Sequence, residues 1–330
     1  MRTLAFARAG VYFTPMIRIP AICFALVLAC ALWTAAPSRA DTALSMGDEP
    51  GFLVASPTNV NQDLQLQADF GYVADADFTN GLGSVSISRA SVQADYSIFH
   101  LSYEVSIFDW TNRAQLTRSF HMARSVTPWE KLHDITFQAR LLNNQLADKW
   151  RYWVNGELNS SFEESVPGAV GVGFDGGVAY DFWNGWMLGI TAKTVAVSAL
   201  SSDLFGDLEF GLALAVSQKT LRETLKAIGL IESEKEGTDK IGLNFALSAS
   251  DKTYRLSPDN PVYGDGYVGI VRSKVGVYLD YFPNDNLTFS IGPEYHYSRK
   301  YKLYNKAGTY KSSHDLDNAL GGYARILWRF

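Results

Sequence analysis

The chain has 330 residues, of which 47% are hydrophobic and 19% are charged, and its formal net charge is −5. This acidic balance, without a cluster of basic residues, argues against a nucleic-acid partner. Both cysteines, Cys23 and Cys30, fall within the first 40 residues, so the rest of the chain has neither disulfides nor thiolate metal ligands available to it.

Residues 1–40 have the pattern of an export signal peptide. Arginines at positions 2, 8 and 18 precede an apolar run at 19–36 that is short for a membrane anchor, and Ser38 and Ala40 are small. We expect cleavage after Ala40, which would leave 25 basic and 34 acidic residues and a net charge of −9. The alternative is a lipoprotein box at 27–30 with cleavage before Cys30, although the apolar run continues beyond that cysteine.

The residues after Ala40 contain no apolar segment near the ~20 residues that a membrane helix needs. Residues 41–61 are polar and contain two prolines, so we expect a periplasmic lead-in. From residue 62 to 330 the chain consists largely of segments of about ten residues in which apolar and polar side chains alternate. A membrane-spanning chain without such helices must close its backbone hydrogen bonds in a barrel, with one strand face towards lipid and the other towards the interior.

The alternation predicts twelve strands, an even number as single-chain barrels require. In chain order we expect them at residues 62–73, 84–94, 98–110, 132–142, 150–162, 170–182, 186–192, 208–216, 240–250, 271–281, 287–297 and 318–330. A slip of phase between Arg89 and Val92 predicts a bulge in the second strand. Pro293 lacks a backbone donor and predicts a bulge or frayed pairing in the eleventh.

One connection has a different periodicity. Between the eighth and ninth strands, Leu221, Leu225, Ile228 and Ile231 recur at helical spacing among charged residues. A short amphipathic helix is therefore expected within 219–231, packed against the barrel rim, although its role is left open.

The connections also sort by length. If the carboxyl end is periplasmic, the connections at Tyr96, Asn143, Asn184 and Asn284 are periplasmic and mostly short, whereas those on the other side, such as the loop expected at 300–317, are mostly longer. A secreted soluble β-sandwich is the alternative explanation of the alternation, but it predicts no such sorting.

The last strand, Asn318–Phe330, places five apolar residues on one face at a period of two: Leu320, Ala324, Ile326, Trp328 and the terminal Phe330. This end resembles the closing strand of Gram-negative outer-membrane β-barrel proteins. The resemblance implies an all-β chain in the cell outer membrane, folded as a single closed antiparallel barrel in contact with outer-membrane lipid and lipopolysaccharide. It also implies that Trp328 and Phe330 act as an assembly signal read by the barrel-assembly machinery. It reaches no characterised family, and oligomeric state and cargo stay open.

Charged residues on the face opposite the apolar one must point into the barrel, since each Arg or Lys at the lipid midplane would cost about 2–4 kcal/mol. The candidates for lining the lumen are Glu104, Arg140, Glu157, Asp175, Arg272, Lys274, Glu294, His296, Arg325 and Arg329. Those from 272 onward fall on three adjacent strands and are expected to form a mixed-charge patch. Two interpretations follow: a pore or transporter for small hydrophilic solutes, or a structural or surface-interaction barrel whose lumen is filled by ion pairs.

The segment His296-Tyr297-Ser298 resembles the His-x-Ser pair of outer-membrane phospholipase and lipid A deacylase barrels, in which the histidine activates the serine. In those enzymes the pair faces lipid, whereas the alternation here turns His296 and Ser298 inward, and Arg299 stands where the deacylase pattern has asparagine. An acyl hydrolase is thus only a third hypothesis, and we expect no enzymatic activity. The other four histidines show no ligand spacing, so neither a metal nor a cofactor is expected.

Overall fold

The computed structural model describes residues 64–78, 83–111, 128–147, 150–163, 169–183, 186–198, 204–216, 218–229, 241–260, 262–284 and 286–330. They belong to one compact unit, Asp41–Phe330. The expected signal (1–40), the lead-in (41–61) and the Asn184–Gly185 turn lie outside them. Within the described ranges, no helix combines the length and the apolar character needed to cross a membrane.

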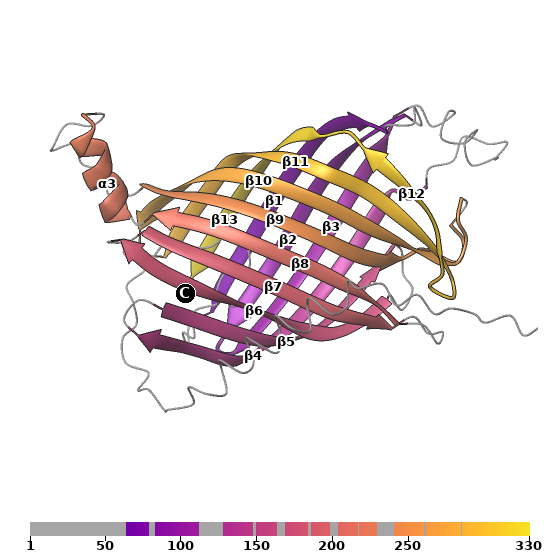
Figure 1. Ribbon diagram of the computed structural model, residues 1–330, viewed down its shortest axis with the longest axis horizontal. Coiled ribbons are helices and arrows are strands. Elements are labelled where there is room, and N and C mark those ends of the chain that lie inside the picture. Colours follow the sequence, from indigo (N-terminus) through magenta and orange to yellow (C-terminus); the bar gives the residue numbers. More distant parts are fainter. Residues whose placement is uncertain are drawn as a thin grey trace, which may run out of the picture. The chain divides into compact units, whose positions relative to one another are not determined.

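Strands form nearly all of the described chain (Figure 1). They are β1 (Gln65–Asp77), β2 (Ser84–Tyr96), β3 (Phe99–Trp110), β4 (Lys131–Ala147), β5 (Trp150–Phe162), β6 (Ala169–Trp183), β7 (Trp186–Ser198), β8 (Leu204–Val216), β9 (Ile241–Arg255), β10 (Gly266–Asn284), β11 (Leu287–Asn305), β12 (Tyr310–Leu316) and β13 (Ala319–Arg329). From β1 to β12 sequential neighbours pair antiparallel, β13 pairs with both β11 and β1, and the pairing of β10 with β11 closes the sheet. β12 and β13 pair with successive parts of β11 and therefore occupy a single strand position in the sheet. Counted in this way, the closed barrel has the twelve strands that the alternation predicted.

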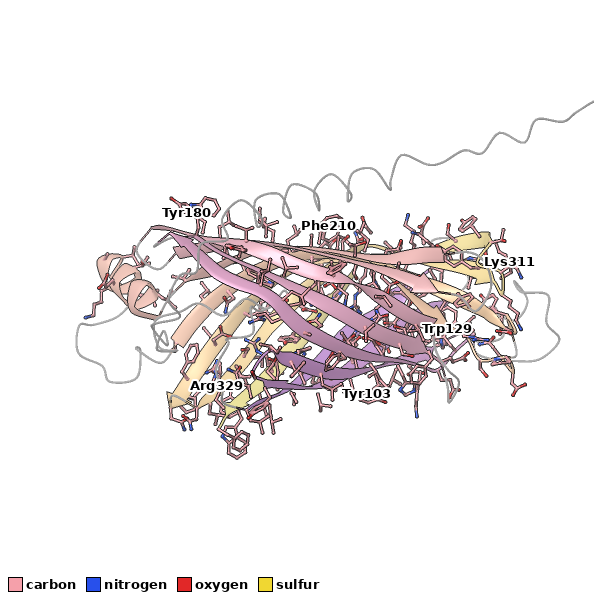
Figure 2. All side chains as sticks on the ribbon, turned by 90° about the horizontal axis from the view of Figure 1, so that it is seen from below. Tyr103, Trp129, Tyr180, Phe210, Lys311 and Arg329 are labelled. Atoms are coloured by element: carbon pink, nitrogen blue, oxygen red, sulfur yellow. The ribbon has the colours of Figure 1, made fainter. Side chains whose placement is uncertain are left out.

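The barrel carries apolar side chains on its outside over most of its height. Phe70, Val172 and Ile291 are 56%, 58% and 64% exposed, and Figure 2 shows Phe210 projecting from the outer surface. Ionisable side chains alternate with them and are buried, among them Glu157 and Glu294. This polarity is the reverse of that of a water-soluble sandwich, as expected where lipid surrounds the strands.

Several strands are longer than the alternation predicted. β1 continues past its expected end at Val73 to Asp77, β4 continues through Asn143 and Asn144 to Ala147, and the expected loop at 300–317 consists mostly of the end of β11 and of β12. The alternation of apolar and polar residues did not predict the ends of β9 and β11, because these ends extend beyond the apolar band on the outer surface of the barrel. Their outward positions there are polar, for example Asp251, Lys300 and Lys302, so no apolar row marks the strand.

The bulge expected between Arg89 and Val92 is wrong, since β2 pairs without interruption with both β1 and β3 through these residues. The phase slips because Val85 and Ile87 face the interior, where they are 0% and 5% exposed, whereas Val92 faces outward and is 58% exposed. The interrupted strand pairing expected at Pro293 is present on the side of β11 that faces β10. The β10–β11 ladder lacks partners at Gly292 and Pro293, although its register is the same before and after them.

In the described chain one helix, α3 (Gln218–Ala227), follows β8 and overlaps the segment 219–231 where the amphipathic helix was predicted. It lies at the same end of the barrel as the turn at Ser97–Ile98 and the carboxyl terminus (Figure 1), here called the C-terminal end. Gly229, with φ of 74°, ends it in the left-handed conformation typical of a helix C-cap.

Candidate functional site in the barrel interior

The interior differs between the two ends of the barrel. Opposite the C-terminal end, apolar side chains fill it, and we call this set the aromatic cluster: Val73, Ala76, Phe78, Val85, Ile87, Phe108, Trp110, Trp129, Leu132, Tyr254, Leu256, Val268, Ile270, Tyr301, Leu303, Leu316 and Ala319. Trp110 stacks on Phe78 at 5.8 Å, meets Trp129 edge-on at 5.1 Å and donates its Nε1–H to the Trp129 carbonyl at 2.5 Å. Tyr301 meets Trp129 edge-on at 5.3 Å. The expectation of a polar interior is therefore wrong for this end.

The ring of strands is smaller around the aromatic cluster. None of the cluster residues comes from β5, β6, β7 or β8. Instead, Phe162 at the end of β5 pairs directly with Arg255 at the end of β9, and the Glu163 amide donates to the Arg255 carbonyl at 2.9 Å. The Ser257 amide donates to Glu163 Oε2 at 2.8 Å. The contact between β5 and β9 thus closes the ring at this height and leaves the tips of β6–β8 outside it.

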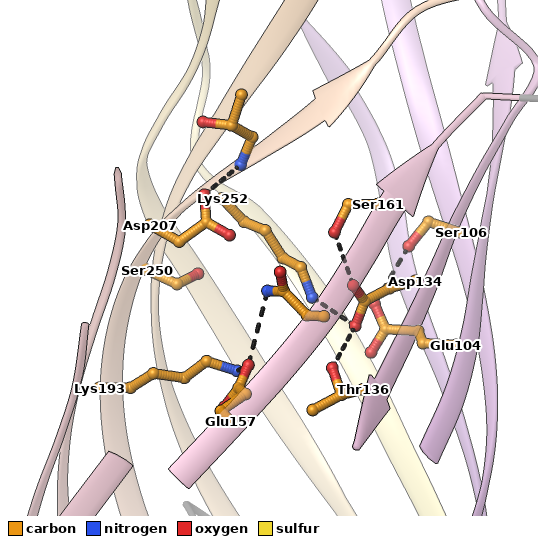
Figure 3. A network of polar contacts seen from close by, with 12 residues as sticks. Glu104, Ser106, Asp134, Thr136, Glu157, Ser161, Lys193, Asp207, Ser250 and Lys252 are labelled. Atoms are coloured by element: carbon orange, nitrogen blue, oxygen red, sulfur yellow. Dashed lines mark hydrogen bonds and ion pairs between the residues drawn. The ribbon is translucent and has the colours of Figure 1, made fainter. Parts of the chain in front are cut away.

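On the side of the aromatic cluster nearer the C-terminal end, ion pairs cross the interior (Figure 3). Lys252 Nζ of β9 lies 2.5 Å from Asp134 Oδ2 of β4, although these strands are not neighbours in the sheet. Ser161 and Thr136 also donate to the Asp134 carboxylate, at 2.6 and 3.0 Å. Asp134 is 6% exposed, and these three donors compensate its burial.

A second ion pair in Figure 3 joins Lys193 of β7 to Glu157 of β5 at 2.5 Å. Glu157 is 2% exposed and also accepts hydrogen bonds from Gln138 at 2.9 Å and Asn159 at 3.5 Å. With Glu104, whose carboxylate accepts from Ser106 at 3.4 Å, this side of the interior has more carboxylates than lysines.

The opposite side of the interior centres on Glu294 of β11. Its carboxylate accepts from Lys274 Nζ at 2.6 Å, Tyr278 Oη at 2.6 Å and His296 Nε2 at 3.0 Å. Glu294 and His296 are 5% and 1% exposed. The structure thus brings together Lys274, Glu294 and His296 of the expected mixed-charge patch.

The arginines of that patch are held separately. Arg272 donates to Ser250 Oγ at 3.1 Å, and Arg325 donates to Ser290 Oγ at 3.1 and 3.3 Å, with Asp280 Oδ1 at 3.9 Å. Arg329 lies nearer the C-terminal end (Figure 2), and its Nε has no hydrogen-bond partner in the described chain.

Two further candidates lie on β4 and β6, the strands on either side of β5, and both are in register with Asn155. Arg140 of β4 donates through Nε to Asn155 Oδ1 at 3.2 Å, while both of its terminal nitrogens lack a partner among the described residues. Asp175 of β6 is 6% exposed, and its Oδ1 likewise lacks one there. The two side chains thus line the interior with hydrogen-bonding capacity still available.

The His-x-Ser pair is not assembled as the alternation predicted. Ser298 has a φ of 48° and sits in a bulge where β11 has one residue more than β10. The bulge leaves Ser298 exposed and returns Arg299 to the interior, so the inward orientation expected for Ser298 is wrong. His296 is bonded to Glu294, and within the described ranges no hydrogen bond joins it to Ser298.

Trp328 and Phe330 stack on each other at 4.8 Å on the outer surface, where they are 52% and 56% exposed. The Phe330 amide donates to the Leu64 carbonyl at 3.0 Å, so the terminal residue is fixed to the start of the first strand. Both side chains are therefore accessible from outside the barrel.

Sequence reasoning missed the residues that cross the interior. Asp134 alternates with Ile135 inside a predicted strand and could have been found by its facing. Lys252 lay beyond the predicted end of its strand, although Ser248 and Ser250 continue the same inward row to it. Within the described ranges, no group of three or more histidines and carboxylates is arranged to hold a metal ion.

No protein-family model matches the chain, and no curated protein matches its sequence. Solved structures of outer-membrane β-barrel channels resemble its fold. An outer-membrane channel from Pseudomonas putida F1 has a TM-score of 0.46 at 8% identity, over 88% of this chain and 100% of that one. The P. putida toluene transporter TodX has 0.38 at 10% identity, over 84% and 93%. The KdgM porin has 0.38 at 6% identity, over 80% and 99%. The likeness is to the barrel fold of outer-membrane channels.

Proposed function

We propose that the chain is a channel of the cell outer membrane that passes small hydrophilic solutes, with the C-terminal end in the periplasm and the aromatic cluster at the extracellular side. The observation that carries this proposal is the inverted polarity of the barrel. Side chains such as Phe70 and Ile291 face outward, while Glu157, Asp175 and Glu294 are buried inside. Lipid accounts for the outward face, and a hydrated path accounts for so many inward charges.

The aromatic cluster favours a second candidate function, a structural or surface-interaction barrel with a filled lumen. Trp110, Trp129 and Tyr301 are each no more than 3% exposed, and the Lys252–Asp134 ion pair crosses the interior below them. On the channel proposal this arrangement is the closed state, and conduction requires the cluster to be displaced. On the second, the cluster is permanent, and the extracellular turn between β11 and β12 makes the functional contacts.

Single-channel recording in planar bilayers distinguishes the two functions. If the chain is a channel, we expect rare steps in the recorded current from the unaltered protein. We expect frequent steps once substitutions open the aromatic cluster. If neither the unaltered protein nor a folded, cluster-opened variant conducts at any voltage, the chain is not a channel.

Acyl hydrolysis is tested separately. We expect no hydrolysis of phospholipid or lipid A by the unaltered protein, because the pairing of His296 with Glu294 leaves it away from Ser298. Activity that is lost in Ser298→Ala would contradict this.

The assembly role of Trp328 and Phe330 belongs to the same proposal. Because both rings are exposed at the end of the closing strand, the assembly machinery can reach them. Removal of Phe330 is expected to lower the amount of folded protein in the outer membrane, while refolding of the purified chain into detergent is retained.

A further inference from the structure

Two arginines border the aromatic cluster on inward-facing rows, since Arg89 lies two residues after Ile87 on β2 and Arg299 lies two residues before Tyr301 on β11. Arg299 of β11 is 5% exposed and donates through Nη1 to the Asp317 carbonyl at 3.1 Å. Its Nη2 is buried without a hydrogen-bond partner in the described chain, as is Nε of Arg89 on β2. Both arginines therefore have unpartnered donors at the boundary of the aromatic cluster.

Asp69 and Glu104 lie at inward positions on the two strands beside Arg89, but within the described residues Arg299 forms no ion pair with a carboxylate. Glu294 on the same strand already accepts hydrogen bonds from three donors, including Lys274 and His296. Burying a guanidinium without a carboxylate costs free energy, and a second positive charge adds to that cost. A bound anion would offset both.

The fold determines which way the two side chains face. The bulge at Ser298 makes both His296 and Arg299 face inward, although they are three residues apart. Gly71 lies opposite Arg89 on β1, and a Cβ added there would meet no heavy atom nearer than 3.8 Å. The interior beside Arg89 is thus lined by a residue that has no side chain.

We propose that Arg89 and Arg299 bind a small organic carboxylate inside the barrel. Guanidinium groups form charge-assisted hydrogen bonds to carboxylates, often two at once. The apolar residues Ile87 and Tyr301 follow the arginines on the same inward rows, which favours an anion with an apolar tail over inorganic phosphate. The inference names a solute class for the proposed channel and rests on that function for its transport consequence, whereas binding is measured independently of conduction.

The test is calorimetric titration of the folded full-length barrel in detergent with sodium butyrate, at constant ionic strength. We expect saturable binding that weakens about tenfold or more in Arg299→Gln, because one charge-assisted hydrogen-bonding partner is lost. Lys300→Gln is the matched control. It removes the same charge from the next residue, which faces the opposite side of β11, and should leave butyrate affinity unchanged.

Three outcomes would overturn the proposal: no saturable butyrate binding, equal affinity in Arg299→Gln, or an equal loss in Lys300→Gln. Binding of sodium phosphate as tight as that of butyrate would also overturn the assignment to organic carboxylates. If Arg299→Gln does not fold, as judged by heat-dependent migration in electrophoresis, the half-buried Arg89→Gln takes its place with the same expectation. A barrel that binds butyrate but never conducts would sink the channel function and leave the binding site standing.

Discussion

Opening the aromatic cluster is the perturbation that separates the two candidate functions most sharply. The double substitution Trp110→Ala and Trp129→Ala removes two indoles that are 3% and 2% exposed. Each buried Trp→Ala change costs about 3–5 kcal/mol, and part of this is the cavity left behind. A water molecule occupies roughly 30 Å³ in the liquid, so the space of two indoles admits several waters beside the polar network below.

We therefore expect the double variant to remain folded, to melt at lower temperature, and to conduct frequently in planar bilayers where the unaltered protein conducts rarely. Trp150→Ala with Trp328→Ala is the matched control, since it removes two indoles that are 44% and 52% exposed on the outside. The control should conduct as the unaltered protein does. The reasoning is refuted if the folded cluster variant conducts no more often than the control.

Three other changes test single features of the barrel. Gly177→Ala would place a Cβ against the Trp153 ring and should lower the free energy of unfolding by about 1–3 kcal/mol in urea titrations of the folded barrel. Gly71→Ala, where the new Cβ would have no atom nearer than 3.8 Å, should change it little. Equal effects of the two substitutions would contradict the packing argument. Lys252→Met leaves the buried Asp134 carboxylate without the lysine that pairs with it and should lower the free energy of unfolding by about 3–5 kcal/mol. The side chain of Lys306 is 70% exposed beside Asp265, so Lys306→Met should lower the free energy of unfolding by only about 0–1 kcal/mol. Hydrogen bonds from Lys306 and Arg255 lower the pKa of Asp265, so its stabilising effect is present above the unfolded value of about 3.9 and is lost as pH falls through the lower folded value. Amide exchange of residues 256–265 should therefore accelerate in acid below about pH 4, after correction for intrinsic rates, and Asp265→Asn should remove this step.

The sequence was sufficient to predict the barrel fold and to predict which charged side chains point into the interior, because strand geometry alone makes side chains alternate between the two faces with a period of two. Glu157, Glu294 and His296 are buried at positions that the alternation assigned to the interior. The sequence could not predict which charges meet across the interior, since Lys252 and Asp134 come from strands that do not pair. It also misassigned Ser298, because one extra residue in a strand reverses every facing after it.

The aromatic cluster explains why a rule that held along most of each strand failed at one end. On β2 the inward row changes from Val85 and Ile87 to Arg89 without any break in pairing, so the interior itself changes from apolar to polar at this height. On β11 the Ser298 bulge produces the same change, because it turns Tyr301 and Leu303 inward and leaves Lys300 and Lys302 outside. Outward lysines imply water rather than lipid around this end, and a chain surrounded by water buries its apolar side chains. The barrel therefore has a lipid-facing section with a polar interior and a water-facing section with an apolar interior. Arg89 and Arg299 lie at the boundary between the two, where a solute crossing the barrel would exchange one environment for the other.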